Sequence, residues 1–101
     1  MKKRFIIAVN ITTPESEKAL TEFFTNYGLG WWHWITNVWL VSDPNGRLTT
    51  SEIVDGIVRI LPGIRNLVIE LGIDGSDAWS GVGPKEEKNN MFKWIQEQWN
   101  K

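Results

Sequence analysis

The chain has 101 residues, of which 42% are hydrophobic and 23% are charged, as is typical of one globular domain with its own core. Its formal net charge of −1 disfavours a general nucleic-acid binder, because such proteins usually carry a strongly basic surface. The absence of cysteine excludes disulfides and thiolate metal sites, and it is typical of a reducing compartment. We therefore expect a single domain over residues 1–101.

The first predicted element is a β-strand over residues 4–11, which form a nearly continuous apolar run. The basic residues before it resemble the start of a signal peptide, but the run is too short and Asn10 interrupts it. No stretch approaches the roughly 20 apolar residues of a membrane span. We expect a cytoplasmic protein with no membrane contact. Alternation predicts two faces for this strand: Phe5, Ile7, Val9 and Ile11 on one, and Ile6, Ala8 and Asn10 on the other.

Two amphipathic helices are predicted from their caps and apolar spacing. Thr13 and Pro14 are typical of a helix start, and Gly28 is typical of the residue after its end. Thr49 and Glu52 form a capping box at the start of the second helix, which Pro62-Gly63 ends. The predicted buried stripes are Leu20, Phe23, Phe24 and Tyr27 in the first helix, and Ile53, Ile57, Ile60 and Leu61 in the second.

Between these helices, residues 31–41 contain four of the seven tryptophans and predict a β-hairpin with its turn at Thr36-Asn37. A regular register places Ile35 opposite Val38 and Trp34 opposite Trp39. It predicts two hairpin faces: Trp32, Trp34, Trp39 and Val41 on one, and Trp31, His33, Ile35, Val38 and Leu40 on the other.

The remaining pattern predicts a strand over residues 67–73, a glycine-rich loop over 72–84 and a C-terminal helix over about 85–99. The resulting βαββαβ order, over about residues 3–73, is typical of a ferredoxin-like sandwich. We expect an α/β domain of the α+β type, with a four-stranded antiparallel sheet, two helices on one face and an additional C-terminal helix.

One face of that sheet would lie outside the two helices, and we predict it to be a binding surface. A patch with several tryptophans exceeds what a soluble monomer usually exposes, so either the C-terminal helix or a second chain covers it. The predicted interface residues are Ile6, Ala8, Trp32, Trp34, Trp39, Val41 and Val68, with Asn10 and Glu70 on the same face.

The layout resembles a known group of small proteins. The segments RFIIAVNI, WWHWITNVWLV, NLVIELG and DAWSGVG, in this order over about residues 3–99, are similar to bacterial and phage proteins described as SinR-like. These are placed near the small ferredoxin-like subunit of the CRISPR spacer-integration complex. The resemblance implies a homodimer made by stacking the open sheet faces.

Members of that wider group carry an aspartate at the end of the first strand, proposed as a metal ligand for phosphodiester cleavage. Asn10 stands at the matching position and supplies only a neutral carbonyl oxygen, which disfavours magnesium or manganese binding. We therefore expect no catalytic residue and no cofactor. The alternative is a Mg- or Mn-dependent nuclease or nucleic-acid binder using Asn10, Glu70 and His33.

Other candidate residues have simpler interpretations. His33 is the only histidine, and between apolar neighbours in a strand it is more typical of a structural role than of catalysis. Glu70 could act as an acid or base, but an interface ion pair with Arg4 is favoured. Asp74 and Asp77 are typical turn residues of a glycine-rich loop and do not follow an EF-hand spacing.

We expect a cytoplasmic, non-catalytic binding or assembly protein that forms a homodimer. A foreign protein partner for the tryptophan face is a further alternative. Nucleic-acid binding through Lys2, Lys3, Arg4 and the tryptophans is an alternative that the net charge disfavours.

Overall fold

The computed structural model describes residues 2–10, 13–72 and 90–99. In chain order the elements are β1 (Lys3–Val9), α1 (Pro14–Asn26), β2 (Gly30–Ile35), β3 (Val38–Asp43), α2 (Thr50–Ile60), β4 (Asn66–Glu70), α3 (Met91–Trp94) and η1 (Ile95–Trp99). η1 continues α3 with a π-helical turn, and the two are called the α3–η1 helix below. The glycine-rich loop, with Asp74 and Asp77, and the predicted start of the last helix lie outside the described residues.

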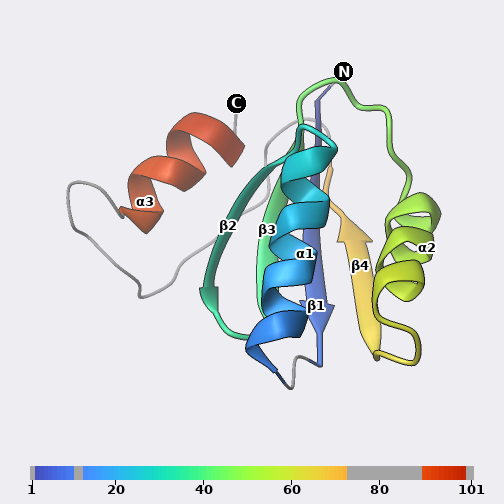
Figure 1. Ribbon diagram of the computed structural model, residues 1–101. Helices are drawn as coiled ribbons and strands as arrows, with labels where there is room; N and C mark the ends of the chain where they lie inside the picture. The colour runs from blue at the N-terminus through green and yellow to red at the C-terminus, as the bar shows by residue number, and fades with distance from the viewer. Residues whose placement is uncertain (1, 11–12, 73–89, 100–101) are drawn as a thin grey trace.

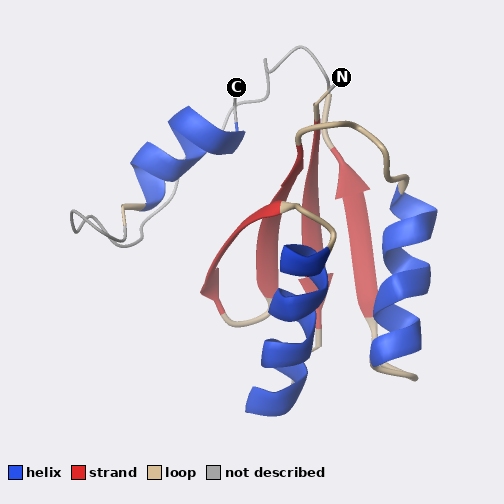
Figure 2. Ribbon diagram, turned by 45° about the horizontal axis from the view of Figure 1, so that its top comes forward, coloured by secondary structure: helices blue, strands red, loops and turns tan. Residues whose placement is uncertain are grey.

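The four strands form one antiparallel sheet in the order β2-β3-β1-β4. α1 and α2 lie against the same face of this sheet (Figures 1 and 2). The α+β class and the four-stranded antiparallel sheet are confirmed. None of the helices formed by the described residues is both long and apolar enough to cross a membrane.

Both long helices begin with the predicted caps. The Thr13 hydroxyl oxygen accepts a hydrogen bond from the Ser16 backbone N–H at 3.1 Å. At α2, the Thr49 hydroxyl oxygen accepts from the Glu52 N–H at 3.1 Å, and the Glu52 carboxylate accepts from the Thr49 N–H at 3.0 Å. This reciprocal capping box fixes where α2 starts.

The tryptophan hairpin departs from the predicted register through a β-bulge. Ile35 stands opposite Val38 as predicted, but Trp32 pairs with Leu40 rather than with Val41. His33 and Trp34 together therefore stand opposite the single residue Trp39. Beyond the bulge every residue of β2 is shifted by one position, so Trp34 and Trp39 do not form the predicted pair.

The prediction that Trp39, Val41 and Val68 lie on the open face is wrong. Trp39 and Val68 both pair with Ile7, and Val41 pairs with Phe5, so all three share the helix-facing side of the sheet. Trp39 and Val41 are fully buried there, and Val68 packs at the edge of the same core. Both faces of these strands are apolar, so periodicity alone could not choose the buried one; the pairing with β1 decides it. The main core consists of Phe5, Ile7, Val9, Leu20, Phe23, Phe24, Leu29, Trp39, Val41, Ile53 and Ile57.

The opposite face of the sheet carries a second apolar cluster. Here the α3–η1 helix buries Met91, Ile95 and Trp99 against Trp32, with Ile6, Leu40 and Leu71 packed around them. The sequence predicted that either the C-terminal helix or a second chain covers this face. The C-terminal helix covers one part of it. The cross-strand row Leu67, Ala8, Val38 and Ile35 lies outside that cluster, and we call it the uncovered row. Leu67 is 60% exposed and Ile35 is 58% exposed.

Candidate functional site

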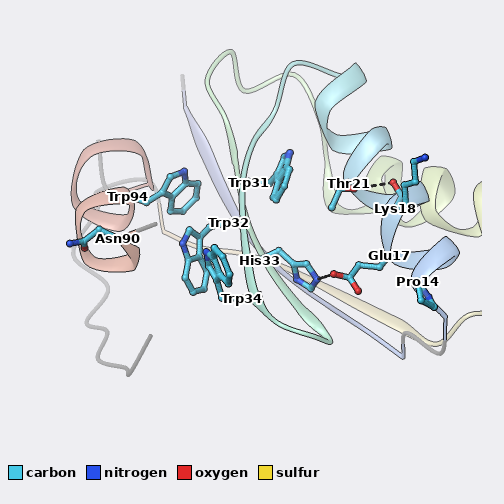
Figure 3. Close-up of a pocket in the computed structure, with 10 residues that line it drawn as sticks. All are labelled: Pro14, Glu17, Lys18, Thr21, Trp31, Trp32, His33, Trp34, Asn90 and Trp94. Atoms are coloured by element: carbon cyan, nitrogen blue, oxygen red, sulfur yellow. Dashed lines mark hydrogen bonds and ion pairs between the residues drawn. The ribbon is translucent and has the colours of Figure 1, made fainter. Parts of the chain in front are cut away.

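A groove lies beside the bulged strand β2, at the edge of the sheet. β2 is a terminal strand in the sheet order and supplies Trp31, Trp32, His33 and Trp34. α1 forms one wall, and the start of the α3–η1 helix forms the other (Figure 3). The groove is partly open and has a volume of about 680 Å³, within the usual range for small-molecule sites. We call this hollow the tryptophan groove; its lining residues are Pro14, Glu17, Lys18, Thr21, Trp31, Trp32, His33, Trp34, Asn90 and Trp94.

Four indoles line the tryptophan groove, and they differ in exposure. Trp34 is 52% exposed and Trp31 is 37% exposed, so both present ring surface to a ligand. Trp32 is buried, with its ring centroid 6.2 Å from that of Trp34, and Trp94 is half-buried on the opposite wall. The Trp31 indole N–H donates to the Thr25 hydroxyl oxygen at 3.0 Å, which fixes this ring against α1.

His33 is held at the floor of the groove by contacts on both ring nitrogens and on one ring face. Nδ1 lies 2.9 Å from the Val38 carbonyl oxygen, and Nε2 lies 3.0 Å from the Glu17 carboxylate (Figure 3). Its ring stacks on the Trp39 indole, with centroids 3.5 Å apart and planes 3° from parallel. With only 5% of its side chain exposed, His33 is a fixed part of the groove.

The contacts of His33 tie β2 to β3 and to α1. A carbonyl oxygen only accepts, so a hydrogen bond to Val38 requires a hydrogen on Nδ1. Nε2 faces the Glu17 carboxylate, which links the imidazole to the first turn of α1. Lys18, on the groove wall, lies 4.0 Å from Glu22 of the same helix, and both side chains are largely exposed.

The three residues of the alternative catalytic site do not come together. Glu70 pairs opposite Phe5, whereas Asn10 follows Val9 at the other end of β1, so about five residues, or roughly 16 Å, separate them. His33 contacts Glu17 and Trp39 instead. In the described part of the chain, no three His, Asp or Glu side chains form a group able to hold a metal ion.

The predicted interface residues are divided among four environments. Trp39, Val41 and Val68 belong to the main core. Ile6 and Trp32 lie under the α3–η1 helix, and Ala8 belongs to the uncovered row. Trp34 is exposed in the tryptophan groove.

Two basic residues at the start of β1 hold the end of the α3–η1 helix. The Arg4 guanidinium lies over the Trp99 ring, 5.2 Å from its centroid, and donates to the Gly72 carbonyl oxygen. The Lys2 amine donates to the Gln98 carbonyl oxygen, where the helix dipole favours a cation. Burial lowers the pKa of Lys2, and the nearby charge of Arg4 lowers it further. The Trp99 and Lys2 contacts hold the C-terminal helix against β1, and the ion pair of Glu70 with Arg4 of the same or another chain stays a prediction.

The α1 and α3 sides of the groove were missed by the sequence prediction. Glu17, Lys18 and Thr21 resemble ordinary exposed helix residues, and Asn90 and Trp94 lie far from them in the chain. One usable signal existed: a buried histidine needs partners for two nitrogens, and Glu17 is a nearby acid in the first turn of a helix.

Comparisons with known proteins identify no relative of this chain. No protein-family model, no curated protein and no solved structure matches the chain.

Proposed function

We propose that this protein is a non-catalytic binding protein that takes up its ligand in the tryptophan groove. The observation that carries the proposal is the exposure of Trp34 and Trp31 in a 680 Å³ hollow whose floor is held in place by hydrogen bonds. An exposed indole on a fixed frame offers a large contact area and little loss of conformational entropy on binding.

The proposed site uses three elements that are distant in the chain. β2 supplies the floor, α1 supplies Glu17, and the α3–η1 helix supplies Trp94. Because the α3–η1 helix is docked through Trp99 and Ile95, the groove depends on the same contacts that cover the open sheet face. Binding and helix docking are therefore coupled in this proposal.

The groove proposal is tested by screening a fragment set with neutral, cationic and anionic members against the ¹⁵N-labelled protein. We expect bound fragments to shift the indole N–H signals of Trp31, Trp34 and Trp94, whereas the signal of buried Trp39 stays in place. Trp34→Ala should weaken these fragments about tenfold, the loss expected for one aromatic contact. The measurement is a two-dimensional NMR titration, with indole signals assigned from single Trp→Phe variants.

Tyr27→Ala is the matched control for this titration. Tyr27 is an aromatic residue of similar exposure, at 54%, and does not line the tryptophan groove. Its loss should leave the fragment affinities within about twofold. Fragments that bind without moving any groove indole, or a set that yields no binder at all, would contradict the proposal.

We also propose that the fold is a ferredoxin-like sandwich. The strand order β2-β3-β1-β4, with α1 and α2 on one face, is the arrangement expected of a ferredoxin-like sandwich with right-handed crossovers. The same arrangement is expected from the resemblance to SinR-like proteins.

Self-association through the uncovered row is a second candidate function. Leu67 and Ile35 are the two most exposed large hydrophobic side chains among the described residues, and they lie at opposite ends of this row. Apolar side chains aligned across a sheet face favour contact with a second copy. Since the α3–η1 helix covers the neighbouring cluster, the interface is smaller than full stacking of open faces, and we expect a weak dimer.

Leu67→Glu should return such a dimer to the monomer, because it places a charge in the apolar contact. The measurement is light scattering or sedimentation over a range of protein concentrations. Val58→Glu, at a 43% exposed position on α2, is the control and should not change the mass. A wild-type protein that stays monomeric at every concentration would rule out this second function.

A further inference from the structure

The polar groups that line the tryptophan groove include both hydrogen-bond acceptors and hydrogen-bond donors. The Glu17 side chain is 43% exposed, and its carboxylate has acceptor capacity beyond the bond to His33. Thr21 donates its hydroxyl hydrogen to the Lys18 carbonyl oxygen at 2.9 Å, so towards the groove its oxygen can only accept. Trp32, Trp34 and Trp94 each carry an indole N–H donor, and Lys18 carries an amine. A ligand that fits this lining must therefore both donate and accept hydrogen bonds while also covering indole faces.

The charges of the groove favour a neutral ligand. The lining holds one carboxylate, Glu17, and one ammonium, Lys18, so neither sign of charge is in excess. The one lysine of the lining, Lys18, has an opposite charge beside it in Glu22. A quaternary ammonium group would find a single carboxylate with an ammonium in the same lining, and a nucleic-acid strand would find one lysine rather than a row of cations for its phosphates.

A proline-rich peptide also matches aromatic grooves in general, but it fits this lining poorly. Its exposed backbone groups are mainly carbonyl acceptors, because proline has no N–H. Such a segment cannot donate to Glu17 or Thr21. A sugar ring has the required combination, since its hydroxyl groups both donate and accept and its flat C–H face is apolar enough to lie on an indole.

We infer that the tryptophan groove binds a neutral oligosaccharide, with sugar rings stacked on Trp34 and Trp31 and hydroxyl groups donating to Glu17 and Thr21. This inference rests on the proposed binding function of the groove. The 680 Å³ volume is sufficient for a short chain of sugar units.

The test is an NMR titration of the ¹⁵N-labelled full chain with three separate probes: cellotriose, maltotriose and triacetylchitotriose. We expect at least one of them to shift the Trp31 and Trp34 indole signals in a saturable manner. Trp34→Ala should weaken that saccharide by about tenfold or more, and Tyr27→Ala should leave its affinity within about twofold. Because no net charge is involved, the affinity should change by less than about twofold between low and high salt.

Three further probes separate failure of this inference from failure of the binding function: a thymidine oligonucleotide, a polyproline peptide and tetramethylammonium. If no saccharide binds but one of these, or a screened fragment, shifts the groove indoles, the saccharide class is wrong and the groove remains a binding site. A saccharide that binds with equal affinity to the Trp34→Ala variant would also overturn the inference. If no probe and no fragment shifts a groove indole, the inference and the proposed function both fail.

Discussion

Trp39→Ala is expected to lower the free energy of unfolding by about 3 to 5 kcal/mol, the range for removing a large aromatic side chain from a core. Trp39 is fully buried, its ring packs edge-on against Phe24 at 6.2 Å, and it stacks on His33 at 3.5 Å. Truncation leaves a cavity beneath His33 and removes the surface on which that ring rests. The measurement is denaturant unfolding followed by circular dichroism.

Trp34→Ala is the matched comparison within the same hairpin. Trp34 is 52% exposed, so we expect its loss to cost about 1 kcal/mol or less. A regular hairpin would place Trp34 and Trp39 opposite each other and make the two variants similar in effect. Similar destabilisation by both would therefore contradict the bulge, whereas a difference of several kcal/mol supports it.

Trp39→Phe makes the comparison usable if the alanine variant does not fold. The Trp39 indole N–H is buried and has no hydrogen-bond partner among the described residues, so phenylalanine removes volume without breaking a hydrogen bond. We expect a loss of about 1 to 2 kcal/mol, intermediate between wild type and the alanine variant.

The elements of this fold could be predicted because each one depends on local sequence. Thr13 and Thr49 bond to the backbone three residues later, so the helix starts could be identified from short segments. The hairpin turn was also local, with Ile35 opposite Val38 as predicted. These features need no knowledge of what packs against them.

Which face of each strand is buried could not be predicted in the same way. Val68 was predicted to lie on the open face, yet it packs at the core, and Leu67 and Ile69, which alternate with it, lie exposed on the outer face. The bulge at His33 and Trp34 then shifts β2 by one residue relative to β3. Where both faces of a strand are apolar, only pairing across the whole sheet decides which one is buried.

The candidate site was predicted only in part, because its lining also depends on how the elements pack together. Trp34 was correctly expected to lie outside the core, and it lines the groove. Its partners, Glu17 and Trp94, come from helices whose positions depend on the sheet and on the docking of the C-terminal segment. Such a convergence of side chains is a property of tertiary structure, with little trace in the spacing of residues.

Trp99→Ala is expected to undock the α3–η1 helix from the sheet. Trp99 is 4% exposed in the second cluster, and Arg4 lies 5.2 Å from the centre of its ring. Removing the ring leaves a cavity and takes away the aromatic face below the guanidinium, at a cost of about 3 kcal/mol or more. Amide hydrogen exchange in residues 91–99 should accelerate by about a hundredfold, with a smaller change in β1.

Gln96→Ala, at an exposed position on the same helix, is the control and should leave this exchange unchanged. Trp99→Phe should retain most of the protection, because it keeps a ring beneath Arg4 and the Trp99 indole N–H has no hydrogen-bond partner among the described residues.

Since Trp94 and Asn90 line the tryptophan groove, undocking the helix should also abolish ligand-induced shifts of the Trp34 indole. Rapid exchange with intact groove binding would show that β2 and α1 suffice for the site. Loss of both the exchange protection and the groove binding would show that the C-terminal helix, which covers part of the open face, also completes the binding groove.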